Sequence, residues 1–264
     1  MRLFISGMLL LSAQYVNAAS NCDINAIVQH AWPDAKPTAE GKLLTQHNQV
    51  IDITGNSPQS ALCRVWPAHP ELTLAAIPLM AQQYSDYDRI GDLELLVLDS
   101  TSLDVKQRLH LPERMNDDAI QITGLALDTA RWKVTPDQTA FGLRVARTGS
   151  SRVNPFSEDA LSLFVIENNQ LRAVLNGIVL ENSTGEWDGN CVGTFHDIKR
   201  TLALAPDSHN GYIDIRVNEK NVESTAYTDA NEQCASKDKP GKASWVLRYD
   251  GKQYAIPKEL SPLF

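Results

Sequence analysis

From about residue 48 onward, the chain alternates short apolar runs with clusters of Gly, Pro, Asn, Asp or Ser. Each apolar run has the length of a β-strand, and a turn signal follows roughly every 8 to 15 residues. This pattern predicts an all-β fold, either a sandwich or a propeller-like array of antiparallel hairpins. The expected strands are Val50–Ile53, Ala61–Val65, Leu72–Ile77, Leu93–Leu98, Val105–Leu111, Ile120–Leu127, Ala140–Ala146, Leu161–Ile166, Leu171–Leu180, Thr194–Ala203, Tyr212–Val217, Ser244–Tyr249 and Gln253–Ile256.

Before this region, Asp23–Trp32 has the pattern of one short helix. Ile27 and Ala31 lie one helical turn apart and belong to an apolar stripe. Asp23 is a suitable N-cap, and Pro33 ends the helix because proline lacks the N–H that a helix interior needs. We therefore expect a short N-terminal helix that packs on the β body.

Two segments of the chain resemble one another in polarity. Leu93–Asp99 and Leu161–Glu167 match at most positions, and a polar turn follows each of them, so both predict a β-hairpin. Their offset of 68 residues exceeds the period of about 40 to 50 residues of a propeller blade, so a regular propeller is not established. No linker rich in Pro, Gly or Ser divides the chain, and we expect a single β-rich domain over residues 20–264.

Residues 1–19 have the order of a secretory signal peptide. Arg2 precedes a short apolar run, and small residues near its end suit cleavage after Ala18. This run is too short to span a bilayer, and we expect no transmembrane segment in the mature chain. Lipid attachment is disfavoured because Asn21, rather than Gly, Ala or Ser, precedes Cys22. We expect a mature protein that is periplasmic or secreted.

All four cysteines follow the signal peptide, at Cys22, Cys63, Cys191 and Cys234. An even number of cysteines in an exported chain predicts two disulfides, for which three connectivities exist. Pairing Cys22 with Cys63 and Cys191 with Cys234 closes the smallest loops and is favoured. A zinc site is disfavoured because the chain has no C-x-x-C pair.

The formal net charge is −8, and it becomes −9 when Arg2 leaves with the signal peptide. An acidic protein lacks the basic face that a nucleic-acid backbone requires, so no nucleic-acid partner is expected. Lys237, Lys239 and Lys242 form a basic cluster with Lys252 nearby, which we interpret as a solvated loop. The net charge suits a basic exported protein as partner, since opposite charges speed association.

One acidic segment has carboxylates at nearly alternating positions, at Asp86, Asp88 and Asp92. With Gly91 it resembles a degenerate calcium loop of the FG-GAP type. It departs from an EF-hand because Ile90 occupies a ligand position and no glutamate closes the loop. We expect no tight calcium site and no cofactor, and the three aspartates remain the candidates for metal ligands.

No motif for catalysis stands out, and no catalytic residue is assigned. The serine-rich segment Thr148–Arg152 lacks a G-x-S-x-G elbow, and His196–Asp197, an adjacent acid and base, would point to opposite faces of a strand. The acidic clusters are Asp117–Asp118 and Glu186–Asp188. In the second, Trp187 between two acids could stack on a sugar, but we interpret this cluster as a tight acidic turn held by a disulfide.

The tail of the chain predicts a hairpin over Trp245–Ile256, with a type I′ turn at Asp250–Gly251. Within it, Leu247–Tyr254 resembles the closing hairpin of several exported bacterial β proteins, including periplasmic lysozyme inhibitors with FG-GAP-like folds. The resemblance covers this segment alone and implies no functional residue.

Two functions of different classes are consistent with the sequence. The first is a non-enzymatic periplasmic binding or protective protein, such as an inhibitor or immunity protein that recognises an exported hydrolase. The second is a hydrolase of an envelope polymer, with acids such as Glu186 and Asp188 brought beside others by the fold. A pocket with two carboxylates, or a Ser–His pair in hydrogen-bond reach, would favour the enzyme.

Overall fold

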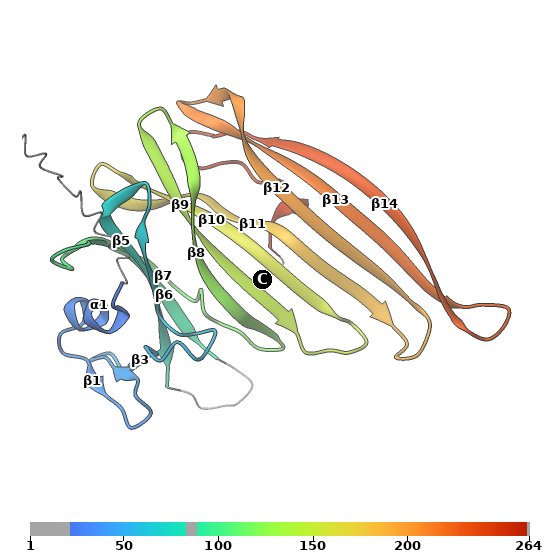
Figure 1. Cartoon of the computed structure of the whole chain (residues 1–264), viewed down its shortest axis with the longest axis horizontal. Helices are drawn as coiled ribbons and strands as arrows, with labels where there is room; N and C mark the ends of the chain where they lie inside the picture. The colour runs from blue at the N-terminus through green and yellow to red at the C-terminus, as the bar shows by residue number, and fades with distance from the viewer. Residues whose placement is uncertain (1–21, 83–88, 263–264) are drawn as a thin grey trace, which may run out of the picture.

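The computed structural model of the chain describes residues 22–82 and 89–262, and most of them lie in two antiparallel sheets (Figure 1). The all-β prediction is confirmed, and two packed sheets correspond to the sandwich alternative. The predicted signal peptide, residues 1–19, lies outside the described residues, as do Asp86 and Asp88. No helix in the described ranges has the length and apolar character needed to cross a membrane.

The N-terminal sheet has seven strands in the order β1-β2-β3-β5-β6-β7, with β4 also paired to β5. Its middle strands are buried on both faces, which explains the continuous apolar run of β6. Leu93, Leu95 and Val97 face the second sheet, whereas Leu96 and Leu98 face the helix. The strands are β1 Lys36–Pro37, β2 Leu43–Leu44, β3 Gln49–Ile51, β4 Leu62–Trp66, β5 His69–Ala81, β6 Gly91–Asp99 and β7 Val105–Leu111.

The single α-helix, α1 (Ile24–Ala31), covers the outer face of the N-terminal sheet (Figure 1). Asp23 caps it, because its carboxylate accepts a hydrogen bond of 3.1 Å from the backbone N–H of Ala26. Ile27 and Val28 are fully buried against the sheet. The predicted short N-terminal helix is therefore confirmed. The disulfide Cys22–Cys63 joins its start to β4.

The C-terminal sheet has seven strands in the order β14-β13-β12-β11-β10-β9-β8, so each strand pairs with its neighbour in sequence. One face packs on the N-terminal sheet, where Phe141, Leu143 and Phe164 contact its apolar residues. Its strands extend well beyond the predicted apolar runs. They are β8 Ile120–Thr135, β9 Gln138–Gly149, β10 Phe156–Glu167, β11 Gln170–Trp187, β12 Gly193–His209, β13 Tyr212–Thr228 and β14 Cys234–Leu247.

The predicted tail hairpin is confirmed only at its turn, where the N–H of Ala255 donates to the carbonyl of Arg248 and the chain reverses. The predicted length and the type I′ turn are wrong, because β14 ends at Leu247, no strand returns beside it, and only Gly251 of the turn pair has a positive φ. The pair Tyr249–Tyr254 is an isolated bridge, and the N–H of Tyr254 donates to the carbonyl of Val174 on β11. The tail, with the 3-10 helix η1 (Lys258–Leu260), crosses a face of the C-terminal sheet instead. Crossing the sheet buries Tyr249, Tyr254 and Leu260, which a solvent-exposed hairpin would not do.

The interpretation of the lysine cluster as a loop is also wrong. Lys237, Lys239 and Lys242 lie in β14, in register with β13. The segment is polar on both faces, so it lacks the apolar alternation by which a strand is recognised. Because β14 is the edge of the sheet, its lysines and Pro240 protect it from pairing with another chain.

Candidate functional site

The C-terminal sheet extends past the sandwich at its end farthest from α1, toward the lower right of Figure 1. We call this region the distal end. It consists of Val153–Pro155, Glu186–Thr194 and Thr225–Lys237, which lie side by side. The disulfide Cys191–Cys234 lies within it and joins the β11–β12 turn to the β13–β14 turn.

The first of these turns is organised by Asp188. One of its carboxylate oxygens accepts hydrogen bonds from the backbone N–H groups of Asn190, Cys191 and Val192, at 2.8, 3.0 and 3.1 Å. These bonds, that from Asn190 foremost, hold the pKa of Asp188 below its usual range. Gly189 supplies the positive φ that the turn requires. The ionised Asp188 therefore fixes the shape of the turn.

The second turn has a similar construction around Asp229. Its carboxylate accepts hydrogen bonds from the backbone N–H groups of Asn231 and Gln233, at 2.8 and 2.9 Å. Its own N–H donates to the carbonyl of Gln233, which closes the turn. The bond from Gln233, followed by that from Asn231, lowers the pKa of Asp229. Both turns joined by the disulfide are thus held by an internal carboxylate.

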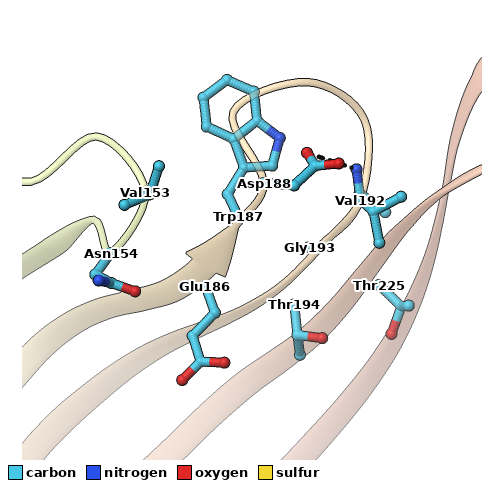
Figure 2. A pocket seen from close by; sticks show the side chains of 10 residues that line it. Val153, Asn154, Glu186, Trp187, Asp188, Val192, Gly193, Thr194 and Thr225 are labelled. Carbon is cyan, nitrogen blue, oxygen red and sulfur yellow. Dashed lines mark hydrogen bonds between the residues drawn. The ribbon is translucent and has the colours of Figure 1, made fainter.

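The two faces of the sheet differ at the distal end. Glu186, Thr194 and Thr225 are direct neighbours across three strands and share one face. A shallow hollow on this face is lined by these residues, and His196 lines an adjoining one. Figure 2 shows Trp187 on the opposite side of the strand from Glu186. The predicted acidic cluster therefore divides, because alternate residues of a strand face opposite sides.

Apolar side chains are exposed at the distal end. Val153, Val192 and Tyr227 are 47, 51 and 43% exposed. Among the described residues, the other large apolar side chains classed as exposed are Ile90 and Val246. Three of the five exposed large apolar side chains in the described ranges thus belong to the distal end.

The charge of the two turns is uniformly negative. Residues 186–192 and 228–234 contain four carboxylates and neither lysine nor arginine. These carboxylates belong to Glu186, Asp188, Asp229 and Glu232. Val192 and Tyr227 are therefore close to negative charge, whereas Val153 follows Arg152, and Lys237 is a basic residue of the distal end.

The remaining candidates from the sequence form hydrogen bonds that stabilise nearby strands and turns. Asp197 accepts a hydrogen bond of 2.6 Å from the Ser183 hydroxyl, on the face opposite to that of His196. In the serine-rich segment, the Ser151 hydroxyl accepts a bond from the N–H of Asn154, as in an ordinary turn. No catalytic pair is formed by these residues.

The other acidic candidates have structural partners. Asp117 pairs with Arg89 at 2.8 Å and accepts a hydrogen bond from the N–H of Ile122. Asp118 accepts one from Ile120, and Asp92 accepts one of 2.7 Å from the N–H of Glu113. In the part of the chain that the structure describes, no group of three His, Cys, Asp or Glu side chains is placed to hold a metal ion.

One carboxylate pair was missed by the sequence analysis. Asp128 and Asp159 flank Arg144, at 3.0 and 3.2 Å from its nitrogens. Burial raises the pKa of Asp159. Burial acts in the same direction on Asp128, but hydrogen bonds outweigh it there and lower the pKa, and the largest of these comes from the N–H of Ala130. The three side chains come from three strands, so sequence spacing carries no signal for them.

No family model, no curated protein and no solved structure matches this chain.

Proposed function

We propose that this chain is a non-enzymatic binding or protective protein of the periplasm or extracellular space. In this proposal it is an inhibitor or immunity protein that recognises a basic exported hydrolase through the distal end. Two disulfides support an oxidising compartment, because such bonds are rare in the cytosol. The signal peptide expected from the sequence supports the same compartment.

The observation that carries the proposal is that Val153, Val192 and Tyr227, three of the five exposed large apolar side chains among the described residues, all belong to the distal end. Apolar groups that gather on a surface mark sites of association, because their burial against a partner is favourable. Trp187 lies beside Val153, because its backbone N–H donates a hydrogen bond of 2.8 Å to the carbonyl of Val153. Tryptophan is enriched among the residues that dominate binding energies at interfaces.

The distal end is held in one shape before any partner binds. Asp188 and Asp229 fix its two turns, and the disulfide joins them. A surface fixed in advance loses little conformational entropy on association, which favours affinity. This construction supports recognition by a rigid surface.

Charge indicates the class of partner. The two turns carry four carboxylates and no basic side chain, and the whole chain has a net charge of −8. A partner with a basic patch around an apolar centre would match both features. Opposite charges would also speed its encounter with the distal end.

A hydrolase of an envelope polymer is the second candidate, and Asp128 with Asp159 favours it. The two carboxylates lie on either side of Arg144, and their pKa values are shifted in opposite directions, as a general acid and a general base require. Asp188 does not suit the role of general acid because its turn keeps the pKa low. Hydrolysis of purified peptidoglycan by the wild type but not by Asp159→Asn would establish this candidate, and no hydrolysis by either would remove it.

The test of the binding proposal uses purified exported hydrolases of positive net charge: a lysozyme, a peptidoglycan amidase and a secreted ribonuclease. We expect the wild-type protein to bind one of them and to inhibit it in a stoichiometric complex. Trp187→Ala and Val192→Ala should each weaken binding by about tenfold or more, the effect of losing roughly 1.4 kcal/mol.

Val246→Ala is the matched control, because Val246 is exposed to 50%, like Val192, but lies on β14 outside the distal end. It should bind as the wild type does. Absence of binding to all three hydrolases, or equal weakening by the control, would overturn the proposal.

A further inference from the structure

Another hollow lies between the two sheets, away from the distal end. It is bordered by the β4–β5 hairpin of the N-terminal sheet and by the β8–β9 and β10–β11 turns of the C-terminal sheet. Its lining includes Trp66, Leu72, Gln138, Ile166 and Glu167. We call it the inter-sheet hollow. Its volume of about 440 Å³ is in the range of small-molecule sites.

The indole of Trp66 is the feature that points to a ligand. Trp66 is 2% exposed, and its N–H hydrogen-bonds no atom of the described residues. An indole N–H can only donate, and a buried donor without an acceptor is destabilising. Of the two rings packed on the indole, Phe141 is buried and His69 is half-exposed. His69, with its ring centroid 4.6 Å from that of the indole, also lines the hollow.

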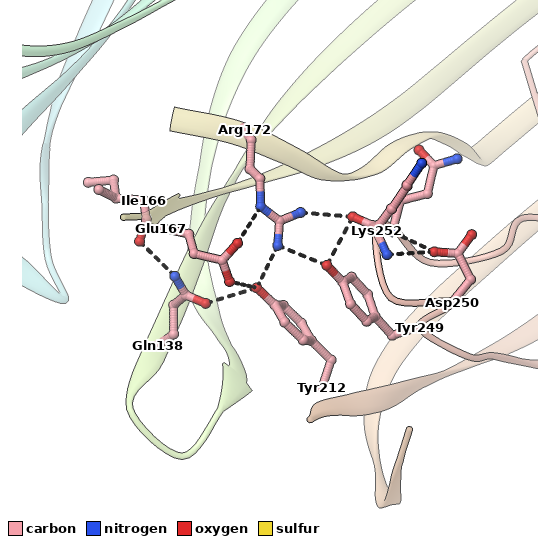
Figure 3. Close-up of polar contacts among 9 residues, drawn as sticks. Gln138, Ile166, Glu167, Arg172, Tyr212, Tyr249, Asp250 and Lys252 are labelled. Carbon is pink, nitrogen blue, oxygen red and sulfur yellow. Dashed lines mark hydrogen bonds and ion pairs between the residues drawn. The ribbon is translucent and has the colours of Figure 1, made fainter. Parts of the chain in front are cut away.

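The opposite wall of the hollow is fixed by hydrogen bonds (Figure 3). The Gln138 amide donates to the Ile166 carbonyl at 2.7 Å, and its oxygen lies 3.1 Å from the Tyr212 hydroxyl. Glu167 lies 3.3 Å from the same hydroxyl and pairs with Arg172 at 2.8 Å. These bonds orient both polar side chains before a ligand arrives.

Arg172 connects this wall to the tail of the chain. Its guanidinium donates to the Tyr249 hydroxyl at 2.8 Å and to the Lys252 carbonyl at 2.8 Å. The hydrogen bond from Arg172 lowers the pKa of Glu167, and burial raises the pKa of Tyr212 to about 12. At neutral pH, Glu167 is therefore an ionised acceptor and Tyr212 a protonated donor.

The composition of the hollow selects the charge of its ligand. Asp137 and Glu167 contribute carboxylates, and no lysine or arginine belongs to its described lining. These carboxylates disfavour an anion, with Asp137 as the main contribution because Arg172 pairs with Glu167. An ammonium group would have no lone pair to accept the N–H of Trp66. The ligand must therefore be able to accept and to donate hydrogen bonds without carrying negative charge.

We propose that the inter-sheet hollow binds a neutral saccharide. A sugar hydroxyl accepts from the Trp66 indole while other hydroxyls donate to Asp137 and Glu167. The C–H groups of the ring pack on Leu72 and Ile166, which supply the apolar part of the lining. This inference is independent of the proposed function, because no residue of the distal end takes part.

The experiment follows the indole N–H resonances of the ¹⁵N-labelled protein, which contains five tryptophans. Glucose, galactose, mannose, N-acetylglucosamine and its β-1,4-linked tetramer serve as probes. Trp66→Phe assigns the Trp66 resonance. We expect at least one sugar to shift this resonance saturably at millimolar concentration and glucuronic acid to leave it unchanged.

Two variants complete the test. Asp137→Asn removes an exposed carboxylate and should weaken binding severalfold, whereas Trp187→Phe at the distal end should bind the sugar as the wild type does. The inference is overturned if no sugar in the panel moves the Trp66 resonance, if sugars move only the other indoles, or if glucuronic acid binds as well as glucose.

Discussion

The ring of Phe195 on β12 occupies the space above Gly185 on β11. The two residues are direct partners in the register of the sheet. A Cβ atom on Gly185 would lie 2.5 Å from Cδ1 of Phe195 and 3.2 Å from the Pro155 ring. Glycine is therefore needed at this position for Phe195 and Pro155 to pack beside the distal end.

Gly185→Ala should lower the free energy of unfolding by about 1–3 kcal/mol, because overpacking displaces neighbouring side chains. Urea unfolding followed by tryptophan fluorescence measures this loss. Gly124→Ala is the matched control, since a Cβ atom there would lie 3.7 Å from that of Ala146, an ordinary contact. Equal losses in the two variants would show that the contact with Phe195 is not the cause.

Removal of the disulfide at the distal end should loosen both of its turns. The bond closes a loop with a sequence separation of 43, for which about 2–4 kcal/mol of stabilisation is typical. In the double variant Cys191→Ser/Cys234→Ser, we expect faster hydrogen exchange at the amides of residues 190–192 and 231–233. Unchanged protection would mean that Asp188 and Asp229 hold the turns without the disulfide.

The stability of the turn around Asp188 should depend on pH in the acidic range. The folded pKa of Asp188 lies below its ordinary value of 3.8 because the bound N–H groups favour the carboxylate. The turn therefore has its full stabilisation above pH 3.8 and loses it as the pH falls through the lower folded pKa. An NMR titration of the Asn190 and Val192 amides should show this transition. Asp188→Asn, which keeps the acceptor oxygen and removes the titration, should abolish it.

The fold class could be predicted from the sequence because most strands of the sandwich bury an apolar face. Leu93–Leu98 and Leu161–Ile166 are apolar runs within β6 and β10, and they predict these strands. The outer parts of β11 to β14 were missed, since residues such as Ser183, Asp197 and Lys220 face water there. Pairing of backbones, which requires no particular side chain, extends these strands.

The candidate site was predictable only in part. The cluster Glu186–Asp188 next to Cys191 indicated an acidic turn beside a disulfide. Sequence spacing does not contain the register of the strands, so it could not place Glu186, Thr194 and Thr225 on one face. The same limit applies to Trp66 and Gln138, which border the inter-sheet hollow from different sheets.

Two adjacent residues of β12 allow a comparison of a buried and an exposed ion pair at the same distance. Arg200 pairs with Glu219 at 2.8 Å, with side chains 4 and 7% exposed. Lys199 pairs with Glu181 at 2.8 Å, with side chains 72 and 55% exposed. Arg200 also donates to the carbonyls of Val179 and Glu259, which joins β12 to β11 and to the tail.

Arg200→Ala should lower the free energy of unfolding by about 3–5 kcal/mol, because it leaves the carboxylate of Glu219 buried without its cation. Lys199→Ala, the control in the neighbouring position, should change it by about 0–1 kcal/mol, since water screens the exposed pair. Urea unfolding of both variants, with and without added salt, measures the two values. Salt should reduce the effect of Lys199→Ala and leave that of Arg200→Ala nearly unchanged. A loss at Arg200 no larger than that at Lys199 would contradict the stabilising role assigned to the buried pair.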